Sequence, residues 1–146
     1  MRLARKLASL AIATLAITAG SLVATTVPAS AAGTCRTVYS TAAWRVQPCV
    51  YGYYYSAAHG YALTGANAKV ERKPAGCATY RVYLVDANNV QRFSTSARPC
   101  VVGLSKPVEV WNGEFGGGNV MARFIAYNSS GATILTLDTP YIHTTY

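Results

Sequence analysis

The sequence predicts an all-β protein: an antiparallel sandwich of Ig-like or Greek-key type, or a small barrel, with about eight or nine short strands. Three observations indicate this class. Turn-forming residues recur every 8 to 15 positions, runs rich in Val, Tyr, Thr, Ile and Phe lie between them, and no segment shows a helical period. The turn signals include Lys73–Gly76, Asp86–Asn89, Asn112–Gly113 and Asn128–Gly131.

Three of these runs alternate between apolar and polar residues. Alternation places one side of a strand against a core and the other toward water. A shorter apolar run, Ile134–Leu137, is expected to be an inner strand. The sides expected to be buried are Ala66, Ala68 and Val70, then Tyr80, Val82 and Leu84, then Val120, Ala122, Phe124 and Ala126.

The first 32 residues predict a secretory signal peptide, because a positive start is followed by an uncharged apolar stretch and by small residues. These parts are Arg2, Arg5 and Lys6, then Leu7–Thr18, then Ala29–Ala32. The stretch contains too many Ser, Thr, Gly and Pro residues for a spanning helix, so we expect cleavage after Ala31 or Ala32. The Ala-rich leader resembles those of secreted actinobacterial proteins. Residues 33–146 would then form one secreted, extracellular domain with no membrane span, and a monomer is expected.

Four Cys in an exported chain predict two disulfides, and four Cys allow three pairings. Cys49 and Cys100 stand in nearly identical surroundings, Pro-Cys-Val-Tyr-Gly and Pro-Cys-Val-Val-Gly. We therefore favour the pairs Cys35–Cys49 and Cys77–Cys100. No C-x-x-C pair is present, so neither a metal site nor a cofactor is expected.

Aromatic residues are the most unusual feature, because five of the 11 Tyr lie between positions 51 and 61. Exposed aromatic rows stack on sugar rings and anchor protein interfaces, whereas Tyr also fills half-buried strand positions without any ligand. A Gly-rich loop near position 115 adds two further aromatic candidates. The candidate contact residues are Tyr51, Tyr53, Tyr54, Tyr55, Tyr61, Trp111 and Phe115.

Trp44 and Arg45 lie inside the loop that a Cys35–Cys49 bridge would close. A Trp-Arg-aromatic triplet in a small disulfide loop is similar to the working part of tendamistat-type α-amylase inhibitors. The third position here is Val46 rather than an aromatic residue, and the resemblance covers about 15 residues. It implies an inhibitor of a secreted hydrolase, an amylase or a protease, that presents Trp44 and Arg45 to its target.

Groups for catalysis are few. The two His residues, His59 and His143, stand in no nucleophile or base motif. Glycoside hydrolysis needs two carboxyl groups that face one sugar bond, and the five available acids lie mostly in turns or beside cations. They are Glu71, Asp86, Glu109, Glu114 and Asp138. We predict no catalytic residue and no enzyme, with an unrecognised site around His59 as the third-ranked hypothesis.

The mature part has a net charge of about +5, from 10 Lys and Arg against 5 Asp and Glu. This charge is spread along the sequence with one cluster, Lys69, Arg72 and Lys73, so no nucleic-acid partner is expected. The first functional hypothesis is a small, secreted, non-enzymatic binding protein. Its aromatic residues would contact an extracellular polysaccharide, the cell envelope or cell wall, or a secreted protein. The alternative is the disulfide-stabilised inhibitor.

Overall fold

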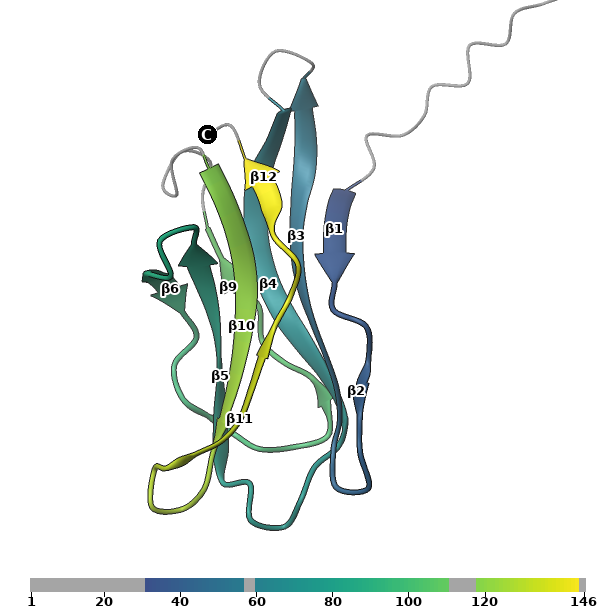
Figure 1. Cartoon of the computed structure of the whole chain (residues 1–146), viewed down its shortest axis with the longest axis vertical. Coiled ribbons are helices and arrows are strands. Elements are labelled where there is room, and N and C mark those ends of the chain that lie inside the picture. Colours follow the sequence, from purple (N-terminus) through teal and green to yellow (C-terminus); the bar gives the residue numbers. More distant parts are fainter. Residues whose placement is uncertain (1–30, 57–59, 111–117, 145–146) are drawn as a thin grey trace, which may run out of the picture.

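The protein is built from two antiparallel β-sheets (Figure 1). The computed structural model describes residues 31–56, 60–110 and 118–144, and of residues 31–32, 53–56, 60–64 and 109 it describes the backbone alone. All 12 elements in these residues are strands, which confirms the predicted all-β class. Eight of them have three residues or more, in agreement with the expected number, and four have only two.

The first sheet has the order β1-β3-β4-β8, with β2 paired to β3 and β9 paired to β4. A long hairpin of β3 and β4 forms its centre. The strands are β1 (Ala31–Cys35), β2 (Tyr39–Ser40), β3 (Arg45–Ser56), β4 (Gly60–Arg72), β8 (Gly103–Leu104) and β9 (Val108–Glu109).

The second sheet has the order β11-β10-β5-β6, with β12 paired to β10 and β7 paired to β5. Its strands are β5 (Thr79–Asp86), β6 (Gln91–Ser94), β7 (Arg98–Pro99), β10 (Gly118–Tyr127), β11 (Thr133–Asp138) and β12 (Ile142–Thr144). The chain passes between the sheets from β4 to β5, from β7 to β8 and from β9 to β10. The two sheets pack face to face around one core, so the fold is sandwich-like.

The predicted inner sides of three strands form this core. Ala66, Ala68 and Val70 on β4 face the inner residues of β5 and β10, among them Val82 and Phe124. The rings of Tyr80 and Phe124 stack with their centroids 5.5 Å apart. Alternation therefore predicted the buried face correctly, because a strand has a period of two whatever its partners are.

Two expectations about burial are wrong. Ile134–Leu137 belongs to β11, which ends the second sheet; Leu137 is buried in the core and Leu135 packs against it partly buried, while Ile134 is 37% exposed. Tyr83 and Met121, expected on the water side, are buried. They pack with Val85 and Ile125 into a second, smaller apolar cluster on the outer face of β5 and β10.

Three buried hydroxyl residues hold the segments that follow the short strands. Thr95 donates its N–H to the Val82 carbonyl and accepts the Val82 N–H on its side-chain oxygen. Ser105 bonds Ala68 in the same reciprocal way, and Thr139 bonds Ala122. Each hydroxyl thus replaces a missing ladder partner, which keeps buried backbone groups satisfied where regular pairing ends.

Both predicted disulfides are present. Cys35 and Cys49 are register partners on β1 and β3, so their bridge joins neighbouring strands of the first sheet. Cys77 precedes β5, Cys100 follows β7, and both are buried in the core. Cys49 lies within the 12-residue β3, whereas Cys100 follows the two-residue β7. The similar surroundings therefore predicted the right pairs although the two segments differ in structure.

Strand pairing brings further cations toward the predicted cluster of Lys69, Arg72 and Lys73. Arg45 pairs in register with Arg72, and Lys69 pairs with Leu104 of β8. Arg98 pairs with Tyr80 near the start of β5. Strand pairing thus adds Arg45 and Arg98, and the segment after β8 adds Lys106, to the cluster of Lys69, Arg72 and Lys73, toward the end where β4 stops and β5 starts (Figure 1).

We predict that Gly65→Ala destabilises the protein by about 3 kcal/mol, through overpacking that the backbone cannot relieve. A Cβ at Gly65 would overlap the Val108 carbonyl oxygen and would lie 3.1 Å from the Tyr51 hydroxyl oxygen. Gly76→Ala is the matched control, because a Cβ there meets nothing within 4 Å. Urea unfolding measures both variants. Equal stability of the two would show that β9 can move away from β4 at little cost.

Candidate functional site

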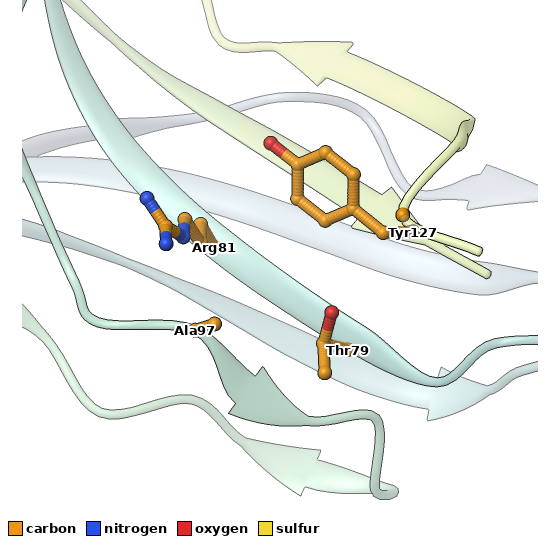
Figure 2. Close-up of a pocket in the computed structure, with 5 residues that line it drawn as sticks. Thr79, Arg81, Ala97 and Tyr127 are labelled. Carbon is orange, nitrogen blue, oxygen red and sulfur yellow. The ribbon is translucent and has the colours of Figure 1, made fainter. Parts of the chain in front are cut away.

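An open hollow of about 260 Å³ lies on the outer face of the second sheet (Figure 2). Thr79 and Arg81 come from the start of β5, where they alternate with the core residues Tyr80 and Val82. Tyr127 ends β10 and is the register partner of Thr79. Ala97, before β7, and Gly131, in the turn after β10, complete the lining.

The turn between β10 and β11 fixes one rim of the hollow. The Asn128 side-chain oxygen accepts hydrogen bonds from the N–H groups of Ser130 and Ala132 and from the Ser130 hydroxyl, which is how Asn nucleates a turn. Gly131 has a φ of +81°, a conformation that favours glycine. The backbone of Asn128 also bonds that of Ala132 and Gly131. This rim is therefore held by local hydrogen bonds.

Tyr127 is the largest side chain of the hollow. Figure 2 shows its ring with one face toward the viewer, near Arg81 and Thr79 of the neighbouring strand. Its hydroxyl lies 3.0 Å from the Tyr83 hydroxyl in a hydrogen bond. Burial, and after it the hydrogen bond to Tyr83, raise the pKa of Tyr127 to about 12, although the nearby Arg81 lowers it. The Tyr127 hydroxyl is therefore neutral at physiological pH, and its hydrogen bond to Tyr83 holds the ring in place.

The groups in the hollow can stack on a ligand and form hydrogen bonds with it. An aromatic ring offers a flat apolar surface, a guanidinium offers five N–H donors, and a threonine offers a hydroxyl. The lining contains no carboxylate, His or Cys among the described residues.

The structure places Trp44 and Arg45 differently from the expectation that both meet a ligand. Trp44 is 7% exposed and packs in the core. Its backbone N–H donates a hydrogen bond to the Thr41 hydroxyl oxygen. Arg45 pairs with Glu71, which Lys69 also contacts. Burial removes the Trp44 ring from the surface, so we correct its assignment as a contact residue. The exposed residues of the loop are Thr37, Val38, Ser40–Ala43 and Arg45.

The tyrosine-rich segment forms the outer end of the β3–β4 hairpin. Tyr51 is half-buried, and its ring lies over Gly65, which has no side chain to occupy that space. The backbone register places Tyr54 opposite Tyr61 and Tyr53 opposite Ala62. The side chains of Tyr53, Tyr54, Tyr55 and Tyr61 lie outside the described residues, and so do Trp111, Phe115, His59 and Glu114.

The carboxylates whose side chains are described all accept hydrogen bonds from cations. Lys69 and Arg45 lower the pKa of Glu71. The Val90 N–H, followed by Arg92 and the Asn88 N–H, lowers the pKa of Asp86. Arg123 holds Asp138 with two bonds of 2.7 and 2.8 Å. These acids are therefore structural partners of cations, and none of them lines the hollow.

His143 is exposed on β12, where its Nδ1 lies 3.0 Å from the Asn119 side-chain oxygen. No set of three or more His, Cys, Asp or Glu side chains converges as metal ligands within residues 31–56, 60–110 and 118–144. The same part of the chain contains no helix of the length and apolarity needed to cross a bilayer.

Sequence reasoning missed the hollow. Alternation did place Tyr127, Thr79 and Arg81 on outer faces, but it could not show that β5 pairs with β10. Comparison of this chain with protein-family models, with curated proteins and with solved structures finds no match. The functional argument therefore depends on the site itself.

We predict that the protein loses stability as the pH rises from 10 to 12. An unfolded Tyr ionises near 10.0, whereas Tyr127 stays neutral in the folded state until about 12, so alkaline pH favours the unfolded state over this interval. Burial raises the pKa of Tyr80 as well, which adds to the loss. Urea unfolding across this pH range checks it. Tyr127→Phe should lose less stability than the parent over the interval, and an unchanged pH dependence would contradict this origin.

Proposed function

We propose that the protein is an exported, non-enzymatic binding protein, and that its ligand is an extracellular polysaccharide held in the hollow around Tyr127. The observation that carries this proposal is the convergence of one ring, one guanidinium and one hydroxyl on an open outer face. The absence of carboxylate, His and Cys from the lining in the described chain supports binding without turnover.

The geometry suits a sugar for two reasons. A sugar ring has one apolar face and a rim of hydroxyls, so it can stack on an aromatic ring while charged and hydroxyl groups bond its edge. Tyr127 supplies the ring, and Arg81 and Thr79 supply the edge contacts. Arg81 further favours a sugar that carries a carboxylate or phosphate, because a guanidinium bonds such groups with two parallel hydrogen bonds.

The Tyr83–Tyr127 hydrogen bond contributes to binding by keeping the ring in place. A side chain that is already ordered loses less conformational entropy when a ligand arrives. The Asn128 turn does the same for the rim. We propose the tyrosine-rich end of the β3–β4 hairpin as a second contact region. This part of the proposal depends on the sequence alone.

The structure gives the inhibitor hypothesis less support than the sequence did, because of the positions of Trp44 and Arg45. It required Trp44 and Arg45 to project from the Cys35–Cys49 loop, but Trp44 packs in the core and Arg45 is held by Glu71. Inhibition by this loop would have to use its other exposed residues, Thr37, Val38 and Ser40–Ala43. No observation favours this loop over the hollow as the contact site.

Export follows from the predicted signal peptide and agrees with the two disulfides, which persist in oxidising compartments. We predict that mass spectrometry of the secreted protein gives an N-terminus at Ala32 or Gly33. Cleavage there leaves the last residues of β1 tied to β3 through Cys35 and Cys49, so the strand can stay in place. Recovery of the uncleaved chain in the membrane fraction would contradict export by this route.

The proposal that the ligand is a polysaccharide is tested by pull-down of the mature protein on peptidoglycan, chitin, cellulose and starch at several salt concentrations. We expect binding to at least one of them that survives high salt, because stacking on Tyr127 is not screened. Tyr127→Ala should weaken that binding by about tenfold, the size of a single moderate anchor. Tyr127→Phe should retain it, because the ring remains.

Tyr141→Ala is the matched control, because Tyr141 is 47% exposed and lies outside the hollow. Arg81→Gln should weaken binding most for acidic glycans and least for neutral ones. Binding that is equally strong in Tyr127→Ala and Tyr141→Ala would exclude the hollow, and the same measurement on a Tyr54→Ala, Tyr61→Ala variant would then test the hairpin.

A further inference from the structure

A second surface of the protein combines exposed aliphatic side chains with cations. Val101, Val102 and Leu104 are 59%, 60% and 70% exposed, and they lie within four consecutive residues. Single exposed apolar residues are normal on a protein surface, whereas a contiguous group marks an interaction site. These three residues are called the aliphatic patch below.

The aliphatic patch is held firmly at both ends. Cys100 precedes it and is fixed by the disulfide to Cys77 and by its N–H bond to the Ala78 carbonyl. Ser105 follows it and bonds Ala68 through both its backbone and its hydroxyl. Between them Gly103, the register partner of Val70 on β4, has a φ of +136°, a conformation that favours glycine. The side chains are thus exposed on an anchored segment.

Cations come to the same end of the sandwich from four segments of the chain. Lys69 is the register partner of Leu104, and Lys106 follows two residues after it. Arg72 and Arg45 pair on the neighbouring strands, while Lys73 and Arg98 lie at the passages between the sheets. Glu71, paired with Arg45 and Lys69, is the one carboxylate beside these six cations in the described chain. This end therefore has a strong positive potential.

We propose that this basic end, with the aliphatic patch at its surface, docks on an anionic lipid bilayer. Val101, Val102 and Leu104 would enter the boundary between headgroups and acyl chains, and Lys106 and Lys73 would face the lipid phosphates. A surface of exposed aliphatic residues with basic side chains around it binds membranes by burying apolar area and by attraction to anionic lipids. Long Lys and Arg side chains can reach the phosphates while their apolar stems lie along the bilayer surface.

The combination of groups favours a bilayer over other anionic partners. A soluble polyanion would contact the cations but would leave Val101, Val102 and Leu104 in water. A bilayer has negative charge and an apolar layer directly beneath it, so it complements both features. The proposal uses residues outside the hollow, so its outcome is independent of the proposed polysaccharide site.

The test is co-sedimentation of the purified mature protein with vesicles. One set contains phosphatidylglycerol mixed with phosphatidylcholine, and the other contains phosphatidylcholine alone. We expect binding to the first set that is at least about tenfold tighter than to the second, because several lysines and arginines each contribute near an anionic surface. The variant Val101→Ser, Val102→Ser, Leu104→Ser should bind the anionic vesicles about tenfold more weakly than the parent.

Two controls separate this surface from general effects. Val90→Ser combined with Ile134→Ser removes exposed aliphatic side chains elsewhere, and it should bind as the parent does. Tyr127→Ala should also bind vesicles normally, whatever it does to glycans. Thermal unfolding confirms that each variant is folded, which is expected because the changed side chains of the aliphatic patch are exposed.

Three results would overturn the proposal. The first is no binding of the parent to anionic vesicles at low salt. The second is binding that the triple serine variant retains in full and that high salt abolishes, since this would be adsorption by charge alone. The third is a parent protein that dimerises in sedimentation equilibrium while the triple variant stays monomeric, since the aliphatic patch would then be an interface between two copies.

Discussion

The antiparallel pairing of β5 with β10 is the constraint on which both the core and the hollow depend. Eight consecutive register pairs join Thr79–Asp86 to Val120–Tyr127. Because successive side chains point to opposite faces, this one register sends Val82 and Phe124 into the core and Arg81 and Tyr127 outward. A shift of the register by one residue would move Val82 and Phe124 out of the core, so burial of the core residues fixes this register.

The outer face of these two strands has two different regions along its length. Toward the end of β5, Tyr83, Val85, Met121 and Ile125 bury one another in a small apolar cluster. Toward the start of β5 the same face opens into the hollow. Tyr83 belongs to the cluster and also bonds Tyr127, so the packed region positions the ring of the open region. A binding residue supported by a packed neighbour is held more accurately than one on a free loop.

The sequence predicted what depends on local pattern, and it failed where distant segments meet. Alternation identified the buried sides of β4, β5 and β10, and the surroundings of the Cys residues identified the disulfides. The hollow needed the pairing of β5 with β10, and the basic end needed Arg45, Arg98 and Lys106 to meet the Lys69 segment; neither follows from spacing. Trp44 shows the opposite error, because an aromatic residue in a small loop can equally be the core contact that holds the loop down.

The Cys77–Cys100 bridge links the two proposed surfaces mechanically. Cys77 stands two residues before Thr79 of the hollow, and Cys100 directly precedes Val101 of the aliphatic patch. Closing this 23-residue separation stabilises the fold by about 3 kcal/mol on the chain-entropy estimate. The bridge also fixes where both segments leave the core, because its two Cys residues are buried there. In an oxidising compartment this disulfide would therefore do more than stabilise the fold. It would also fix the position of the hollow relative to the aliphatic patch. The Tyr127 ring of the hollow offers a stacking contact that salt does not screen, whereas the basic end joins apolar burial to a charge attraction that salt weakens.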